Sequence, residues 1–183
     1  MYISKPKRGV HVEELEIAKK AIQRDEQAFL QLMQVHKAAL YRTAYAFLKN
    51  EHEAIEAMQE VTFRAYQKIH TVKEPKYIKT WLVRIMINYC QTQLKKNRRF
   101  ISGEVLQELR YDENSSYLEI DEAISSLSEK EQQLIHMKYY QDSKIKEIAK
   151  IENIPEGTVK SRLNKALKSL RNFLSEKGGA DHV

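Results

Sequence analysis

Polar side chains between residues 158 and 168 recur at a spacing that places most of them on one face of a helix, since each residue turns a helix by about 100°. That face consists of Lys160, Ser161, Asn164, Lys165 and Lys168. Ammonium groups bind phosphate oxygens, and hydroxyl and amide groups exchange hydrogen bonds with base edges. Thr158 and Arg162 complete this candidate set for duplex contact.

The residues around this face predict the structural motif that carries it. Its buried side is predicted to be Val159, Leu163, Ala166, Leu167 and Leu170. A short apolar stripe precedes it, from Ile145 to Ile151, and between the two Asn153 tolerates a left-handed turn and Pro155 suits a helix start. The pattern predicts a helix-turn-helix. A plain helical hairpin with a solvated basic face is the alternative.

A second basic stretch runs from residue 72 to 97. Cations on a helix with aromatic residues between them suit single-stranded DNA, whose backbone is anionic and whose unstacked bases need flat surfaces. The charge comes from Lys73, Lys76, Lys79, Arg84, Lys95 and Lys96, followed by Arg98 and Arg99. Trp81 could stack on a base, but a single Trp at helical spacing favours the core or a wedge at the domain edge.

Composition bounds the fold. The 183 residues contain only five Gly and three Pro, which leaves little material for hairpin turns and favours an all-α protein. The net charge of +6 suits a polyanionic partner. Basic residues concentrate in 73–99 and 144–171, whereas 100–122 holds seven acids against the single base Arg110.

The sequence does not support a secreted protein, a membrane protein, a metal site or an enzyme. The single Cys90 excludes an internal disulfide, and together with the absence of a signal peptide or a membrane-spanning run it predicts a cytoplasmic protein. The six histidines are scattered and form no metal spacing with Cys90. We find no phosphate-binding glycine loop and no nucleophile motif, so we expect no enzyme, cofactor, metal or small-molecule substrate.

Hydrophobic periodicity divides the chain into two helical domains. Residues 1–12 are expected to be a basic arm, 13–99 a four-helix domain, 100–119 an acidic linker, 120–176 the helix-turn-helix domain and 177–183 a disordered tail. Asp25 is expected to cap the second helix, and Ser128 with Glu131 to form a capping box.

Four segments, in order, resemble the extracytoplasmic-function sigma factors of bacterial RNA polymerase, a branch of the sigma-70 superfamily. They are DEQAF at 25–29, EAIEAMQEVTFRAY at 53–66, TWLVRIMIN at 80–88 and IPEGTVKSRL at 154–163. The similarity covers nearly the whole chain. It implies a factor that binds core polymerase and directs initiation at promoters with minus-ten and minus-thirty-five elements.

The resemblance also implies a role for each segment. Polymerase binding, through a coiled coil of the largest subunit, falls on Glu53, Glu56, Gln59 and Glu60, although Ile55 and Ala57 depart from the family's usual acid and large aliphatic residue. Minus-ten recognition falls on Asn88, which would hold an extruded base, on a pocket built from Val72 to Tyr77, and on the helix bearing Trp81. Recognition of the minus-thirty-five element is assigned to the polar face of residues 158–168.

The remaining partners follow from the same resemblance. The polymerase flap, promoter DNA and a membrane-anchored anti-sigma factor are expected, and the last would hold the chain at the membrane. The acidic linker would thread a basic RNA channel, or is a solvated spacer. The rival interpretation is a conventional helix-turn-helix regulator with a helical sensor or dimerisation domain, which would not need the basic, Trp-containing helix.

Overall fold

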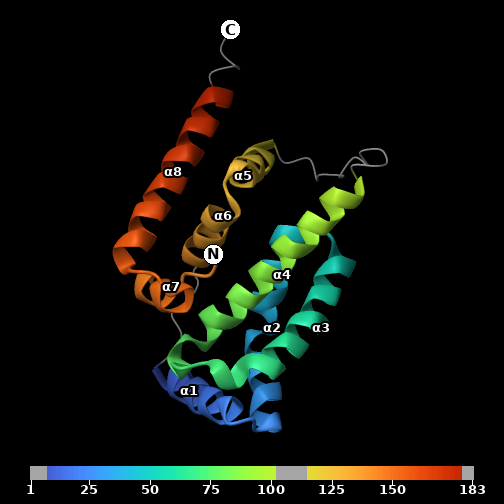
Figure 1. The fold of residues 1–183 in the computed structure, drawn as a ribbon, viewed down its shortest axis with the longest axis vertical. Coiled ribbons are helices and arrows are strands. Elements are labelled where there is room, and N and C mark those ends of the chain that lie inside the picture. Colours follow the sequence, from blue (N-terminus) through green and yellow to red (C-terminus); the bar gives the residue numbers. More distant parts are fainter. Residues whose placement is uncertain (1–7, 102–114, 179–183) are drawn as a thin grey trace. The chain divides into compact units, whose positions relative to one another are not determined.

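The computed structural model describes residues 8–101 and 115–178, and these contain helices and no strand. The α-helices are α1 (Arg8–Ile22), α2 (Glu26–Leu48), α3 (Glu51–Lys68), α4 (Ile78–Ile101), α5 (Ser115–Ser126), α6 (Glu129–Ile135), α7 (Ile145–Glu152) and α8 (Glu156–Gly178). The all-α prediction is confirmed. The chain divides into two compact units, Met1–Leu94 and Lys95–Val183, and the boundary falls inside α4 (Figure 1).

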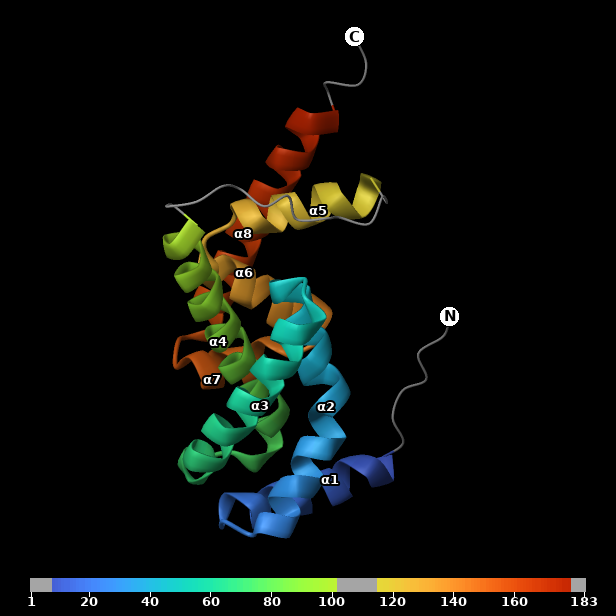
Figure 2. The ribbon, with the colours of Figure 1, turned by 90° about the vertical axis from the view of Figure 1, so that its right-hand side faces the viewer.

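In the first unit α2, α3 and α4 lie side by side, as Figure 1 and Figure 2 both show. Leu32 and Leu40 of α2 and Val61 of α3 are fully buried between them. On α4 the residues that follow Ile78 and Leu82 at helical spacing are not all buried. Ile85 and Tyr89 are half-buried, and the positions beside them complete the core instead. The fully or almost fully buried residues of α4 are Ile78, Leu82, Val83, Met86, Ile87 and Cys90.

Side-chain caps fix where the helices of this unit begin. The Oδ1 atom of Asp25 accepts a hydrogen bond from the Ala28 N–H at 2.9 Å, as predicted. Asn50 accepts one from the Glu53 N–H at 3.0 Å and starts α3. Between these helices Lys49 is left-handed, with φ 53°, so the chain reverses within two residues.

Several element ends differ from the expected ones. Helix α1 begins at Arg8, inside the expected arm. Helix α4 extends to Ile101 and α5 begins at Ser115, so both ends of the expected 100–119 linker are helical. Helix α8 continues to Gly178, into the expected tail. The rest of the linker, tail and arm (1–7, 102–114 and 179–183) lies outside the described residues.

In the second unit α8 packs against α5, α6 and α7. The core includes Met137, Ile148 and Val159, none of which exposes any surface. At the start of α6 the Glu131 carboxylate accepts hydrogen bonds from the Ser128 N–H at 3.1 Å and the Ser128 Oγ at 2.6 Å. The predicted capping box is therefore present, and these bonds are the main reason that the pKa of Glu131 is lowered.

After Ile135 the chain winds into one turn of π-helix, His136–Tyr140, closed by a Gln141 N–H to His136 C=O bond of 3.1 Å. Tyr139 is 54% exposed in this turn, whereas Met137 is buried. The wider turn adds one residue and shifts the helical phase, which a period of 3.6 cannot anticipate.

His136 makes the stability of this unit pH-dependent. Its ring is 5% exposed and stacks on Tyr140 at a centroid distance of 4.9 Å, and burial lowers its pKa to about 4. Unfolding restores the ordinary pKa of about 6.5, so the unfolded chain binds more protons between these values. Stability is full above pH 6.5 and should fall by roughly 3 kcal/mol as the pH drops through 4.

Urea unfolding followed by circular dichroism at pH 7 and pH 4.5 measures this effect. The variant His136→Gln should lose part of the wild-type pH dependence, whereas His52→Gln, at an exposed position on α3, should retain all of it. Equal pH dependence in wild type and His136→Gln would contradict the assignment.

Candidate nucleic-acid and protein interfaces

The polar face of α8 is arranged as its periodicity predicts. Its buried side holds Val159, Leu163 and Ala166. The five predicted polar residues are all exposed: Lys160, Ser161, Asn164, Lys165 and Lys168. Lys165 lies 3.6 Å from the Glu131 carboxylate but keeps 78% of its side chain exposed, so its charge is only weakly engaged. The face is a continuous basic and hydrogen-bonding surface along about two and a half turns of helix.

Two other members of the predicted set lie elsewhere. Arg162 is half-buried and lines a cavity of about 180 Å³ between α6, α7 and the turn, together with Gln133 and Glu152. Gln133 donates a hydrogen bond to Glu152 at 3.0 Å. Thr158 is also half-buried, and its C=O accepts a bond from the Ser161 hydroxyl at 3.1 Å. Both residues flank the buried side of α8, since rotation by about 100° per residue moves them off the polar face.

The turn before α8 has the geometry of a helix-turn-helix. Asn153 is left-handed, with φ 53° and ψ 46°, and its N–H caps α7 on the Ala149 C=O. The Pro155 C=O accepts from the Val159 N–H at 3.1 Å and so opens α8. The short reversal fixes α8 against α7, as the sequence predicts.

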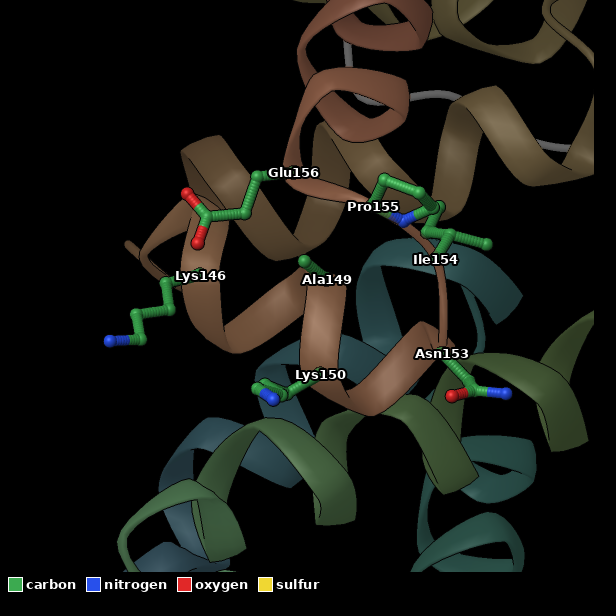
Figure 3. A pocket seen from close by; sticks show the side chains of 7 residues that line it. All are labelled: Lys146, Ala149, Lys150, Asn153, Ile154, Pro155 and Glu156. Carbon is green, nitrogen blue, oxygen red and sulfur yellow. The ribbon is translucent and has the colours of Figure 1, made fainter.

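Two lysines that sequence reasoning did not select lie beside this turn. Lys146 and Lys150 of α7 are exposed and line an open cavity of about 420 Å³ with Asn153, Pro155 and Glu156. Figure 3 shows Lys146 and Glu156 extending to the same side of this cavity and Asn153 to the opposite side. Lys146 and Lys150 are four residues apart, on the face of α7 opposite Ile148. This spacing could have identified them from the sequence.

The second candidate surface is the connection between α3 and α4 with the start of α4. The connection contains two 3-10 turns, η1 (Ile69–Thr71) and η2 (Pro75–Tyr77). Lys73 and Lys76 are exposed, Lys76 is paired with Glu74 at 2.9 Å, and this bond raises the pKa of Lys76. Val72 and Tyr77, expected to line a base pocket, are only 8% and 6% exposed. In this structure both residues are buried and anchor the connection to the core.

Along α4 the predicted residues differ in accessibility. Asn88 is exposed, and so are Lys95 and Lys96 farther along the helix. Lys79, Trp81 and Arg84 are half-buried, which fits the expectation of a Trp at the edge of the core. The exposed amide of Asn88 offers both a donor and an acceptor to a base.

The third candidate surface is the outer face of α3. Glu56 and Gln59 are exposed, and Glu53 and Glu60 are half-buried. Glu60 accepts a bond from Arg64 Nε at 2.7 Å, and the Arg64 guanidinium lies 5.0 Å from the centre of the Tyr89 ring. This acid is therefore partly neutralised within the first unit.

Apolar side chains accompany these acids. Three of them lie on one side of α3, because Phe63 and Tyr66 follow Ile55 by eight and eleven residues. Ile55 is 47% exposed, Phe63 58% and Tyr66 41%. Sequence reasoning noted Ile55 only as a departure from the family pattern and did not select Phe63 or Tyr66 as contacts. A face of acids beside an exposed apolar stripe has the composition of a protein-binding surface.

The described residues hold neither a cluster of metal-ligating side chains nor a long apolar helix. Within residues 8–101 and 115–178 no three His, Cys, Asp or Glu side chains gather closely enough to hold a metal ion. Over the same ranges no helix is both long and apolar enough to cross a membrane.

Comparison with protein families assigns both units. Residues 32–100 match the family model "Sigma-70 region 2", and residues 108–170 match "Sigma-70, region 4". These matches include the candidate surfaces on α3 and α4 and the one on α8.

Curated proteins match over most of the chain. RNA polymerase sigma factor SigV of Bacillus subtilis is 31% identical over 140 residues, which cover 74% of this chain and 84% of that protein. The extracytoplasmic-function sigma factor SigW of the same organism is 28% identical over 171 residues, covering 83% and 91%.

Solved structures share the fold. The sigma factor RpoE of Bartonella quintana, solved in complex with the anti-sigma factor NepR, aligns with a TM-score of 0.62 at 21% identity and covers 80% of this chain and 96% of its own. CnrH, solved in complex with the cytosolic domain of CnrY, aligns with a TM-score of 0.64 at 20% identity and covers 89% and 97%.

Proposed function

The chain belongs to the extracytoplasmic-function sigma factors of RNA polymerase, and from this membership we propose how its residues divide the work of promoter recognition. As a sigma factor it directs promoter-specific transcription initiation. The observation that carries the proposal is the division of contact chemistry between the two units. A basic, amide-bearing face covers α8 in one, and an exposed Asn88 with nearby cations lies on α4 in the other.

Duplex binding at the minus-thirty-five element is proposed for α8. Lys160, Lys165 and Lys168 contact phosphates or guanine edges, and Ser161 and Asn164 read bases. Thr158 and Arg162, half-buried on the flank, position the helix. The first helix of a helix-turn-helix crosses the DNA backbone, so the exposed Lys146 and Lys150 of α7 are added as phosphate contacts.

Removing one phosphate-contacting lysine should change the salt dependence of binding. In Lys160→Ala, the slope of log affinity against log salt should flatten by about one ion, and affinity should drop for all sequences alike. Holoenzyme binding to a minus-thirty-five duplex at several salt concentrations measures the slope. Lys130→Ala, on the exposed side of α6, is the matched control and should keep the wild-type slope. An unchanged slope in Lys160→Ala would remove this residue from the interface.

Strand capture at the minus-ten element is proposed for Asn88, supported by Lys73, Lys76, Lys79 and Arg84, with Lys95 and Lys96 farther along α4. The exposed amide can hold an extruded base by its polar edge, while the lysines neutralise the strand. Val72 and Tyr77 contribute from the core by fixing the connection, and Trp81 supports the helix at its edge.

Polymerase binding is proposed for the outer face of α3. Glu53, Glu56, Gln59 and Glu60 complement a basic coiled coil of the largest subunit and set orientation and association rate. The exposed Ile55, Phe63 and Tyr66 supply apolar area at the same face. Contact of the second unit with the polymerase flap is proposed by family likeness alone.

Regulation by an anti-sigma factor is proposed as well, because a sigma factor with this fold has been solved in complex with an anti-sigma factor. A membrane-anchored partner would hold the chain at the membrane and cover its polymerase-binding surfaces. Affinity capture from membrane extracts tests this, and the absence of any membrane protein that competes with polymerase would contradict it.

A further inference from the structure

Helix α1 lies against the part of the first unit that carries the proposed minus-ten contacts. It packs on α2 and also on both 3-10 turns of the α3–α4 connection, η1 and η2. Figure 1 and Figure 2 show α1 at the same end of this unit as that connection. Ala18 and Ala21 expose no surface, and their small side chains allow close approach of the helix backbone. The position of α1 therefore influences the position of the connection.

A close contact, in which the buried His36 Nε2 atom makes no hydrogen bond, links α1 to α2. His36 of α2 is 4% exposed, and its Nε2 lies 3.3 Å from Oε1 of Glu14, whose side chain is 25% exposed. Burial lowers the pKa of His36, the Glu14 carboxylate opposes that shift, and Lys79 of α4 adds to it. One imidazole is thus within electrostatic reach of α1 and of a proposed minus-ten lysine.

A second contact joins the α1–α2 turn directly to the connection. Arg24 is left-handed, with φ 68°, and its Nη2 lies 3.3 Å from Nδ1 of His70 in η1. Because a guanidinium only donates, Nδ1 is the acceptor in this contact. Nearby, the Tyr66 hydroxyl donates to Glu26 at 3.1 Å, so the end of α3 is also held to the start of α2.

We propose that Glu14 and Arg24 are positioning residues for minus-ten recognition. Glu14 holds α1 on α2, and Arg24 holds the α1–α2 turn on η1. Because α1 packs on η1 and η2, the two contacts together keep the connection and the start of α4 in place for the opened strand. The role rests on the proposed function of Asn88 and the connection. Neither residue contacts DNA in this account; each acts through His36 or His70.

The test uses holoenzyme reconstituted from core polymerase and full-length chain, with strand opening followed by permanganate reactivity of promoter thymines. Glu14→Gln keeps the size of the side chain and removes its charge. Arg24→Asn removes the guanidinium and keeps a residue that tolerates φ 68°. We expect each variant to slow opening roughly 2- to 30-fold, the usual range for residues that act through others, with unchanged affinity for core polymerase.

A matched control and a double variant separate positioning from other causes. Lys49→Asn removes a cation from the left-handed position at the opposite end of α2 and should open the promoter at the wild-type rate. His70→Gln should resemble Arg24→Asn, and the double variant should be no slower than either single one, since both remove the same contact. Additive losses would show that Arg24 acts independently of His70 and would overturn the proposal.

The remaining outcomes distinguish a failure of the positioning role from a failure of the proposed minus-ten function. If Asn88→Ala slows opening while Glu14→Gln and Arg24→Asn open normally, the positioning role is rejected and the proposed function stands. If Asn88→Ala opens normally, the proposed function of this surface fails. Thermal unfolding of each variant is measured in parallel, and a loss of opening that matches a loss of folded protein counts against positioning.

Discussion

Replacing Asn88 with alanine is expected to impair promoter opening while leaving duplex binding intact. The exposed amide of Asn88 can both donate to and accept from a base edge. Such a two-point contact is worth about 1–3 kcal/mol, or roughly 5- to 150-fold in the equilibrium for base capture. Extruding the base costs unstacking and unpairing free energy. Loss of the contact that offsets this cost should therefore impair strand opening before it impairs duplex binding.

Holoenzyme carrying Asn88→Ala would be compared with wild type for duplex binding and for thymine reactivity at the same promoter. Gln34→Ala, which removes an exposed amide from α2, is the control and should behave as wild type. Normal opening by Asn88→Ala would reject the base-capture role. Loss of duplex binding before opening would place the residue at a different step.

Truncating Ile148 is expected to cost most of the stability of the second unit. Its side chain exposes no surface and lies on α7 against α8, so Ile148→Ala removes buried methyl groups and leaves a cavity. Such substitutions cost about 2–5 kcal/mol, a large part of the stability of a small domain. Because α7 supports the recognition helix, minus-thirty-five binding should decline with folding.

Urea unfolding measures this loss. Ile120→Ala truncates a side chain of the same type that is 45% exposed on α5, and it should change stability by no more than about 0.5 kcal/mol. Similar effects of the two substitutions would mean that Ile148 is not the anchor of α7.

The recognition helix could be predicted from sequence because its apolar and polar residues separate cleanly at about 100° per residue. Asn153 and Pro155 then left few ways to connect α7 and α8. The capping residues Asp25, Ser128 and Glu131 were equally readable, since each acts within three residues of its own position.

Other features depend on contacts distant in sequence. Helix α4 has apolar residues on several sides, so periodicity did not distinguish Ile85 from Met86 as the inward position. Val72 and Tyr77 are buried in a connection that α1 covers, which local sequence does not reveal. The π-turn after Ile135 adds one residue to the helical phase and exposes Tyr139. Arg162 is half-buried and lines a cavity with Gln133 of α6 and Glu152 of α7.

Run-off transcription with reconstituted core polymerase, followed by sequencing of the transcript starts, tests whether this chain directs where transcription begins. Adding the chain should produce start sites that core polymerase alone does not use, downstream of a shared pair of elements. Those starts should weaken with Asn88→Ala and with combined alanine substitution of Lys160 and Asn164. If the chain binds promoter duplex but the start sites do not change, it acts as a conventional helix-turn-helix regulator and the account is wrong.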